Sequence, residues 1–66
     1  MIIKINEIET NFSGRTLFEL LKEKGIEKNT GIAAAVNESV IKKEEWETFR
    51  LNPNDSVIVI TPAQGG

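Results

Sequence analysis

Apolar residues gather in two short runs at the start of this 66-residue sequence, and the first run is β-branched, a pattern typical of β-strands. The first run contains Ile2, Ile3 and Ile5, and in the second run Ile8 and Phe12 lie on one face. Two such runs separated by an Asn-led pair of residues predict a hairpin. The pair lacks the Asn-Gly signature, so the sequence leaves the type of turn open.

A helical spacing of apolar residues then replaces the strand pattern. Thr16 and Glu19 fit a capping box, in which the side chain of each residue accepts a hydrogen bond from the backbone of the other. Gly25 is placed to end the helix, and Ile26 stands where a Schellman motif has its apolar contact. We predict a helix of about two turns over 16–24, too short to be stable unless it docks on a sheet. Its apolar stripe consists of Leu17, Leu20 and Leu21.

Residues 30–37 are rich in alanine, which favours helix by intrinsic propensity. Gly31 near the start of this segment and Asn37-Glu38 at its end favour a strand instead. We therefore predict a second hairpin that returns through Ile41. Its small residues allow another element or a partner to pack closely against one strand.

The last third of the chain combines a charged stretch with one apolar strand. Residues 42–47 predict a short helical turn, and Trp46 is interpreted as a core anchor for it. The turn signal 52–55 precedes a near-continuous apolar run over 56–61. Such a run suggests a central strand covered on both faces, and Pro62 ends its ladder pairing.

The predicted order is strand, strand, helix, strand, strand, short helical turn, strand. This order suggests an α+β fold, the β-grasp, in which a mixed sheet of about five strands curls around one main helix, with the first and last strands adjacent and parallel. A right-handed crossover through the helix is consistent with it. We expect one domain over 1–61 and a flexible tail over 62–66.

Composition excludes several classes of function. The chain has no Cys and no His, so it has no thiol nucleophile, no imidazole base and none of the usual zinc ligands. A net charge of −2 argues against nucleic-acid binding, and no apolar stretch approaches a membrane span. No phosphate-binding loop and no signal peptide are recognisable. We expect a cytoplasmic protein that is not itself an enzyme, and we interpret Glu44, Glu45 and Glu47 as a solvated acidic surface rather than a metal site.

The sequence Gln64-Gly65-Gly66 is the best candidate for chemistry. Two residues without Cβ can lie extended in a narrow slot of another protein. A terminal carboxylate there is ionised at neutral pH, so it must be activated before it can transfer anything, and we expect activation as an acyl-adenylate. Because this chain shows no ATP-binding motif, a partner enzyme must supply the activation.

Three segments carry a resemblance to a known family: Gly-Ile-Ala-Ala-Ala-Val-Asn at 31–37, Glu-Glu-Trp at 44–46 and Thr-Pro-Ala-Gln-Gly-Gly at 61–66. Together with the early hairpin and the 16–24 helix, they resemble the sulfur carrier proteins of thiamine biosynthesis, the ThiS family. The resemblance covers nearly the whole chain and implies a ubiquitin-like β-grasp.

The resemblance also implies a function. The Gly66 carboxylate would be adenylated by an E1-like adenylyltransferase that uses ATP and magnesium, and sulfur from a donor such as a cysteine desulfurase would give a thiocarboxylate. Thiazole synthase would then receive the sulfur. Recognition of the tail would involve Gly65, Gln64 and Ala63, and this chain would itself bind no cofactor.

A further expectation concerns the surface that partner enzymes bind. We expect an exposed apolar patch near Ala33, Val36 and Ile58 to be the docking surface for both partner enzymes. Two alternatives stay open: the small subunit of molybdopterin synthase or another ubiquitin-like sulfur carrier, and a binding-only ubiquitin-like module with an inert tail.

Overall fold

The computed structural model describes residues 1–26 and 30–61, so the predicted tail 62–66 lies outside the described residues. The elements follow the predicted order. They are β1 (Ile2–Ile5), β2 (Ile8–Asn11), α1 (Leu17–Glu23), β3 (Ala33–Val36), β4 (Ser39–Ile41), the 3₁₀ helix η1 (Lys43–Glu45) and β5 (Ser56–Ile60).

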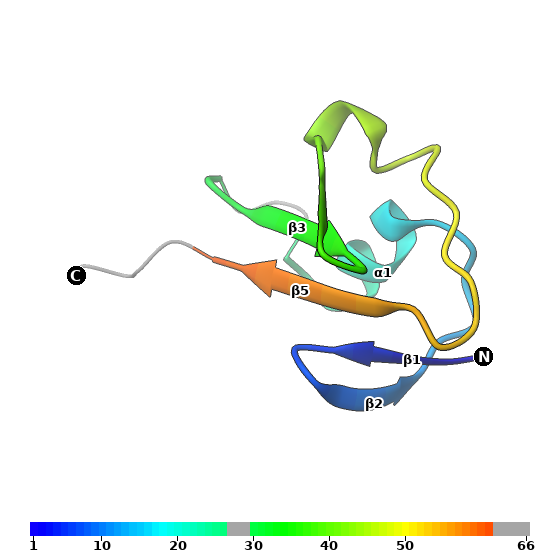
Figure 1. Cartoon of the computed structure of the whole chain (residues 1–66). Coiled ribbons are helices and arrows are strands. Elements are labelled where there is room, and N and C mark those ends of the chain that lie inside the picture. Colours follow the sequence, from blue (N-terminus) through cyan, green and yellow to red (C-terminus); the bar gives the residue numbers. More distant parts are fainter. Residues whose placement is uncertain (27–29, 62–66) are drawn as a thin grey trace.

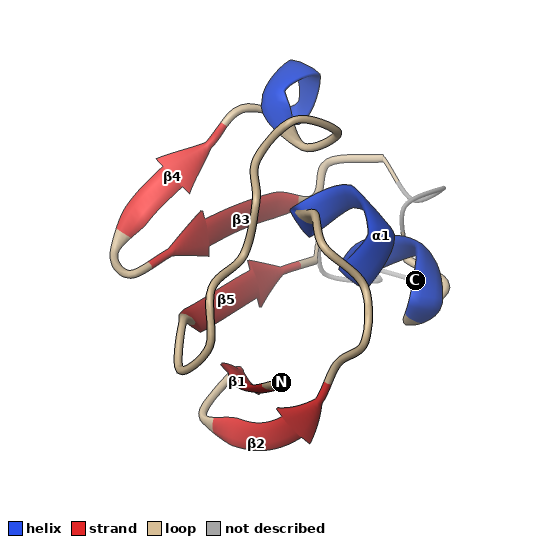
Figure 2. Cartoon of the chain, turned by 90° about the vertical axis from the view of Figure 1, so that its right-hand side faces the viewer, coloured by secondary structure: helices blue, strands red, loops and turns tan. Residues whose placement is uncertain are grey.

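The five strands form one mixed sheet in the order β2-β1-β5-β3-β4. The first and last strands are adjacent and parallel, with Lys4 opposite Ser56. Strand β5 is antiparallel to β3 on its other side and therefore lies at the centre of the sheet. Helix α1 packs against one face of this sheet (Figures 1 and 2). This arrangement confirms the predicted β-grasp.

Helix α1 begins at the predicted capping box. The Glu19 backbone N–H donates to Thr16 Oγ1 at 3.2 Å, and the Thr16 N–H donates to Glu19 Oε1 at 3.0 Å. The Arg15 N–H donates to the same carboxylate oxygen at 2.6 Å. These backbone bonds, first from Arg15 and then from Thr16, hold the pKa of Glu19 below its ordinary value because they favour the ionised form.

The helix ends in the predicted Schellman motif. Gly25 has φ +75°, a conformation that a residue without Cβ adopts at little cost. The Gly25 N–H donates to the Lys22 carbonyl at 3.0 Å, and the Ile26 N–H donates to the Leu21 carbonyl at 3.0 Å. The chain therefore turns sharply away at the residue where the sequence pattern stops.

Both hairpins close through an Asn-Glu pair whose two residues have positive φ. The values are 49° and 70° for Asn6 and Glu7, and 50° and 74° for Asn37 and Glu38. Positive φ at both central residues of a two-residue loop defines a type I′ turn, which settles the turn type that the sequence left open. Glutamate in this left-handed backbone conformation costs conformational free energy, because a Cβ clashes with the neighbouring backbone there.

Strand β5 differs from prediction in one respect: it is central, but only one of its faces is covered. Val57 is buried against α1, whereas Ile60 on the opposite face is 62% exposed. The reason is that residues 1–26 and 30–61 form a single α-helix, and α1 lies on one face of the sheet (Figures 1 and 2). The apolar run of β5 thus serves the core with one face and leaves the other face open.

Trp46 is the core anchor that the sequence predicts. It is 2% exposed, and its indole Nε1–H donates to the Ile41 carbonyl at 3.1 Å. The Phe18 N–H donates to the Trp46 carbonyl at 3.0 Å, which connects α1 to the segment after η1.

Among the described residues, no helix has the length and apolarity needed to cross a membrane. The core consists of Ile3, Phe12, Leu17, Leu20, Leu21, Ala34, Val36, Ile41, Trp46, Leu51 and Val57.

Candidate functional site

Strand β5 is the element that leads to the predicted tail. Its last residue is Ile60, and the candidate site residues come only a few positions later: Ala63, Gln64, Gly65 and Gly66. Those four residues lie outside the described part of the chain. The structure does describe where β5 ends: at the same end of the sheet as the β1–β2 turn (Figure 1).

Strand β1 stops before β5 does. Their pairing ends where Ile5 lies opposite Val57, because β1 turns away at Asn6. The Asn6 N–H donates to the Val57 carbonyl at 2.8 Å, and the Val59 N–H donates to Asn6 Oδ1 at 2.8 Å. The Asn6 side chain thus occupies the position at which a continuing β1 would offer a backbone carbonyl.

A related arrangement holds the beginning of β5. The Asn37 N–H donates to the Ser56 carbonyl at 2.8 Å, and the Ser56 N–H donates to Asn37 Oδ1 at 3.0 Å. Asn37 Nδ2 donates to Asp55 Oδ1 at 3.0 Å, while Asp55 Oδ2 accepts the Asn52 N–H at 2.8 Å. In each Asn-Glu turn, the asparagine side chain therefore accepts a backbone hydrogen bond from β5, one near each end of the strand. The sequence analysis missed both roles, and the repeated Asn-Glu pair was the only local signal for them.

The uncovered face of the sheet carries an apolar strip. Register places Ala35 opposite both Val40 and Ile58, and Ala33 opposite Ile60, so these side chains share one face. Among these side chains, Val40 is 74% exposed and Ile60 is 62% exposed. We call this set the open-face strip: Ala33, Ala35, Val40, Ile58 and Ile60.

The predicted docking residues fall on opposite faces of the sheet. Ala33 and Ile58 belong to the open-face strip, but Val36 does not, because its side chain is 3% exposed and belongs to the core. Successive side chains of a strand point to opposite faces, so Ala34 and Val36 point inward when Ala33 and Ala35 point outward. The prediction of Val36 as a surface residue was therefore wrong, and Ala35 takes its place.

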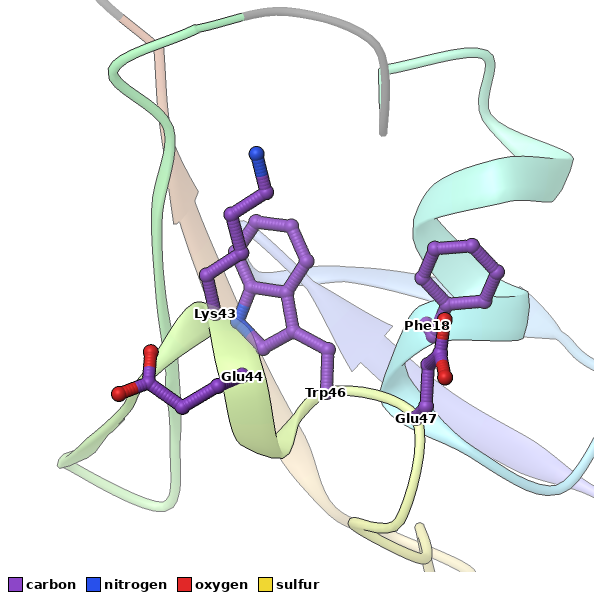
Figure 3. A pocket seen from close by; sticks show the side chains of 5 residues that line it. All are labelled: Phe18, Lys43, Glu44, Trp46 and Glu47. Carbon is purple, nitrogen blue, oxygen red and sulfur yellow. The ribbon is translucent and has the colours of Figure 1, made fainter.

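A hollow of about 420 Å³ lies on the helix side of the molecule, between α1 and η1 (Figure 3). The side chains that line it are Phe18, Lys43, Glu44, Trp46 and Glu47. Its buried polar atom, the Trp46 indole N–H, is already bonded to the Ile41 carbonyl. In residues 1–26 and 30–61, no buried side-chain polar atom lacks a partner and no acidic cluster could hold a metal ion. The hollow therefore shows no group that calls for a ligand.

Comparison with known proteins agrees with the topology. The fold is that of a ubiquitin-like β-grasp protein, in which the central last strand leads to the carboxyl-terminal segment. The model of the ThiS family matches residues 3–66, and the chain therefore belongs to the ThiS family. No curated protein gives a significant match.

Two solved structures share the whole fold. The crystal structure of the thiamine biosynthesis protein ThiS from Geobacter metallireducens superposes with a TM-score of 0.82 at 19% identity, and all of both chains is covered. An NMR solution structure of a thiamine biosynthesis protein from the same organism gives a TM-score of 0.81 at 19% identity, covering all of this chain and 88% of the other. At this identity the likeness establishes the fold.

Proposed function

We propose that this protein is a sulfur carrier of thiamine biosynthesis and that Gly66 is the residue that carries the sulfur. The observation that carries the proposal is the family match, which runs through residue 66 and so includes the Gly65-Gly66 pair. Composition supports it as well. The chain has no Cys, so a sulfur atom bound covalently to it needs another point of attachment, and a carboxyl-terminal thiocarboxylate provides one.

The proposed chemistry needs a partner at each step. The Gly66 carboxylate is ionised at neutral pH and resists attack by a nucleophile. An E1-like enzyme transfers AMP from ATP to this carboxylate with magnesium, releasing pyrophosphate. Hydrosulfide released by the sulfur donor then attacks the acyl carbon and displaces AMP, which leaves a thiocarboxylate. Thiazole synthase accepts the sulfur. Gly65 has no side chain, so the tail can enter a narrow slot in an extended conformation.

We further propose that the open-face strip is the docking surface for the adenylating enzyme. Exposed apolar side chains gathered on one face mark interaction sites in soluble proteins. The strip includes Ile58 and Ile60, which belong to the same strand that leads to the tail. A partner that binds the open-face strip therefore also contacts the end of β5, from which the tail begins.

Intact mass spectrometry tests the carrier function. The protein is incubated with ATP, magnesium, the E1-like enzyme and a sulfur donor. We expect a mass gain equal to the replacement of one oxygen by sulfur, located on Gly66 by fragmentation. Deletion of Gly66 and the substitution Gly65→Val should each abolish the gain while far-UV circular dichroism stays unchanged. An unmodified wild-type mass under these conditions would refute the proposal.

A matched pair of substitutions tests the docking surface. Ile60 on the open-face strip is 62% exposed, and Ile8 on the helix side of the edge strand β2 is 68% exposed. Lysine at either position should therefore change stability little. We expect Ile60→Lys to weaken binding to the adenylating enzyme strongly and Ile8→Lys to leave it unchanged. Equal binding by both variants would show that the strip is not the docking surface.

A further inference from the structure

We propose that Asn6 is a positioning residue for the carboxyl-terminal tail, although it lies 53 residues from the strand position that it holds. Its side chain holds the last part of β5 in the sheet, so that the chain leaves Thr61 from a defined position. This inference rests on the proposed carrier function and adds to it a residue outside the tail.

The first step of the argument is the unequal support of β5. On the β3 side, pairing continues to the end of the strand, where Ala33 lies opposite Ile60. On the β1 side, pairing stops at Val57. The Asn6 Oδ1 atom, 2.8 Å from the Val59 backbone nitrogen, extends support on that side by two residues. Without it, the last residues of β5 would be held from one side only.

The second step concerns why asparagine occupies this place. Asn6 has φ 49°, and asparagine tolerates this left-handed region better than other residues with a Cβ. It also carries an acceptor at the end of a short side chain. The type I′ turn requires the first property and the contact to Val59 requires the second. Glycine would satisfy the turn alone, which separates the two roles experimentally.

The third step links this contact to the tail. A tail that must enter a slot in another protein loses conformational freedom on binding, and a fixed starting point reduces that loss. The two-sided support of β5 provides such a point close to the tail, at the end of the sheet shown in Figure 1. Loss of the contact should therefore raise the KM of the carrier for the adenylating enzyme without changing kcat, since the bound tail is the same.

Asn37 offers an internal control. It occupies the same turn position, has φ 50°, and its Oδ1 accepts a backbone N–H of β5 at 3.0 Å. The difference is that this N–H belongs to Ser56, at the beginning of the strand and far from the tail. A substitution there perturbs stability at least as much, because Asn37 also donates to Asp55.

The experiment measures adenylation of the full-length protein by its E1-like enzyme, as pyrophosphate release with varied carrier concentration. The variants are Asn6→Gly, Asn6→Asp and Asn37→Gly, each checked for folding by circular dichroism. We expect Asn6→Gly to raise KM roughly three- to tenfold, the factor that one hydrogen bond supplies, with kcat unchanged. Asn6→Asp, which keeps the acceptor, should restore KM, and Asn37→Gly should leave it unchanged.

A second measurement needs no partner enzyme. Backbone ¹⁵N relaxation should show increased fast motion at Ile60 and Thr61 in Asn6→Gly but not in Asn37→Gly. An unchanged KM in Asn6→Gly, an equal rise in Asn37→Gly, or unaltered relaxation at Ile60 and Thr61 would each overturn the assignment. Failure of the carrier proposal is distinguishable, because the wild-type protein itself would then not be adenylated.

Discussion

Replacing Trp46 by phenylalanine should destabilise the domain strongly without preventing it from folding. The indole is almost fully buried, and its Nε1–H is bonded to the Ile41 carbonyl at the end of β4. Phenylalanine fits the same space with a smaller ring and has no donor. The substitution therefore removes one buried hydrogen bond and part of the packing between η1 and the sheet.

The magnitude follows from these two losses. Loss of the indole hydrogen bond costs about 0.5–1.5 kcal/mol, because the Ile41 carbonyl keeps its place opposite Ala34 in the β3–β4 ladder. The smaller ring buries less apolar surface and adds about 1 kcal/mol. The expected loss is therefore about 1.5–2.5 kcal/mol, a large part of the roughly 3–10 kcal/mol that a domain of this size has in total.

Urea titration followed by far-UV circular dichroism measures the effect. Fluorescence is unsuitable because Trp46 is the only tryptophan. With an m-value of about 1 kcal/mol/M, the midpoint should fall by about 1.5–2.5 M. Phe18→Leu is the control, since Phe18 is a nearby, partly buried aromatic residue without a polar group, and it should shift the midpoint far less. A shift for Trp46→Phe no larger than that of the control would refute the role assigned to the indole hydrogen bond.

Three other substitutions test the turns and the helix cap. Glu38→Gly should raise the free energy of unfolding by about 0.5–1 kcal/mol in urea titration, because glycine relieves the strain of φ 74°; a loss of stability would show that the Glu38 side chain makes a needed contact. Gly14→Ala should cost about 1–3 kcal/mol, because the new Cβ would lie 2.5 Å from Cζ of the buried Phe12, and an unchanged melting temperature would contradict this packing. The lowered pKa of Glu19 means that its ionised form stabilises the fold above the ordinary carboxyl range and that this contribution is lost as pH falls through and below it. Wild type should therefore lose more stability than Glu19→Gln between about pH 5 and pH 3, and parallel pH profiles would count against the cap.

The helix and its ends could be predicted because their signals are local. Thr16 and Glu19 are three residues apart, and Gly25 lies directly after the apolar stripe, so the sequence holds both partners of each interaction in a short window. The position of β5 was also predictable, since a long apolar run suits the centre of a sheet. The open face of β5 could not be predicted. The run shows that β5 is apolar on both faces, but it does not show whether other elements cover one face of the sheet or both.

The errors at the candidate surface have a related cause. Residues 33–36 read Ala-Ala-Ala-Val, and a strand without polar residues gives no indication of which positions point inward. Val36 was therefore assigned to the wrong face, and its burial and its register with Val57 in the structure show that it points into the core. The role of Asn6 was invisible for a different reason, since its partner Val59 lies at the far end of the sequence.

The central position of β5 also has a consequence for synthesis of the protein. Ribosomes make chains from the amino terminus, so the strand that joins β1 to β3 is the last of the five to emerge. Until Val57 arrives, the two hairpins have no shared neighbour and the core lacks one of its fully buried residues. A chain truncated before β5 cannot complete the sheet, so the native domain can form only after β5 has been made.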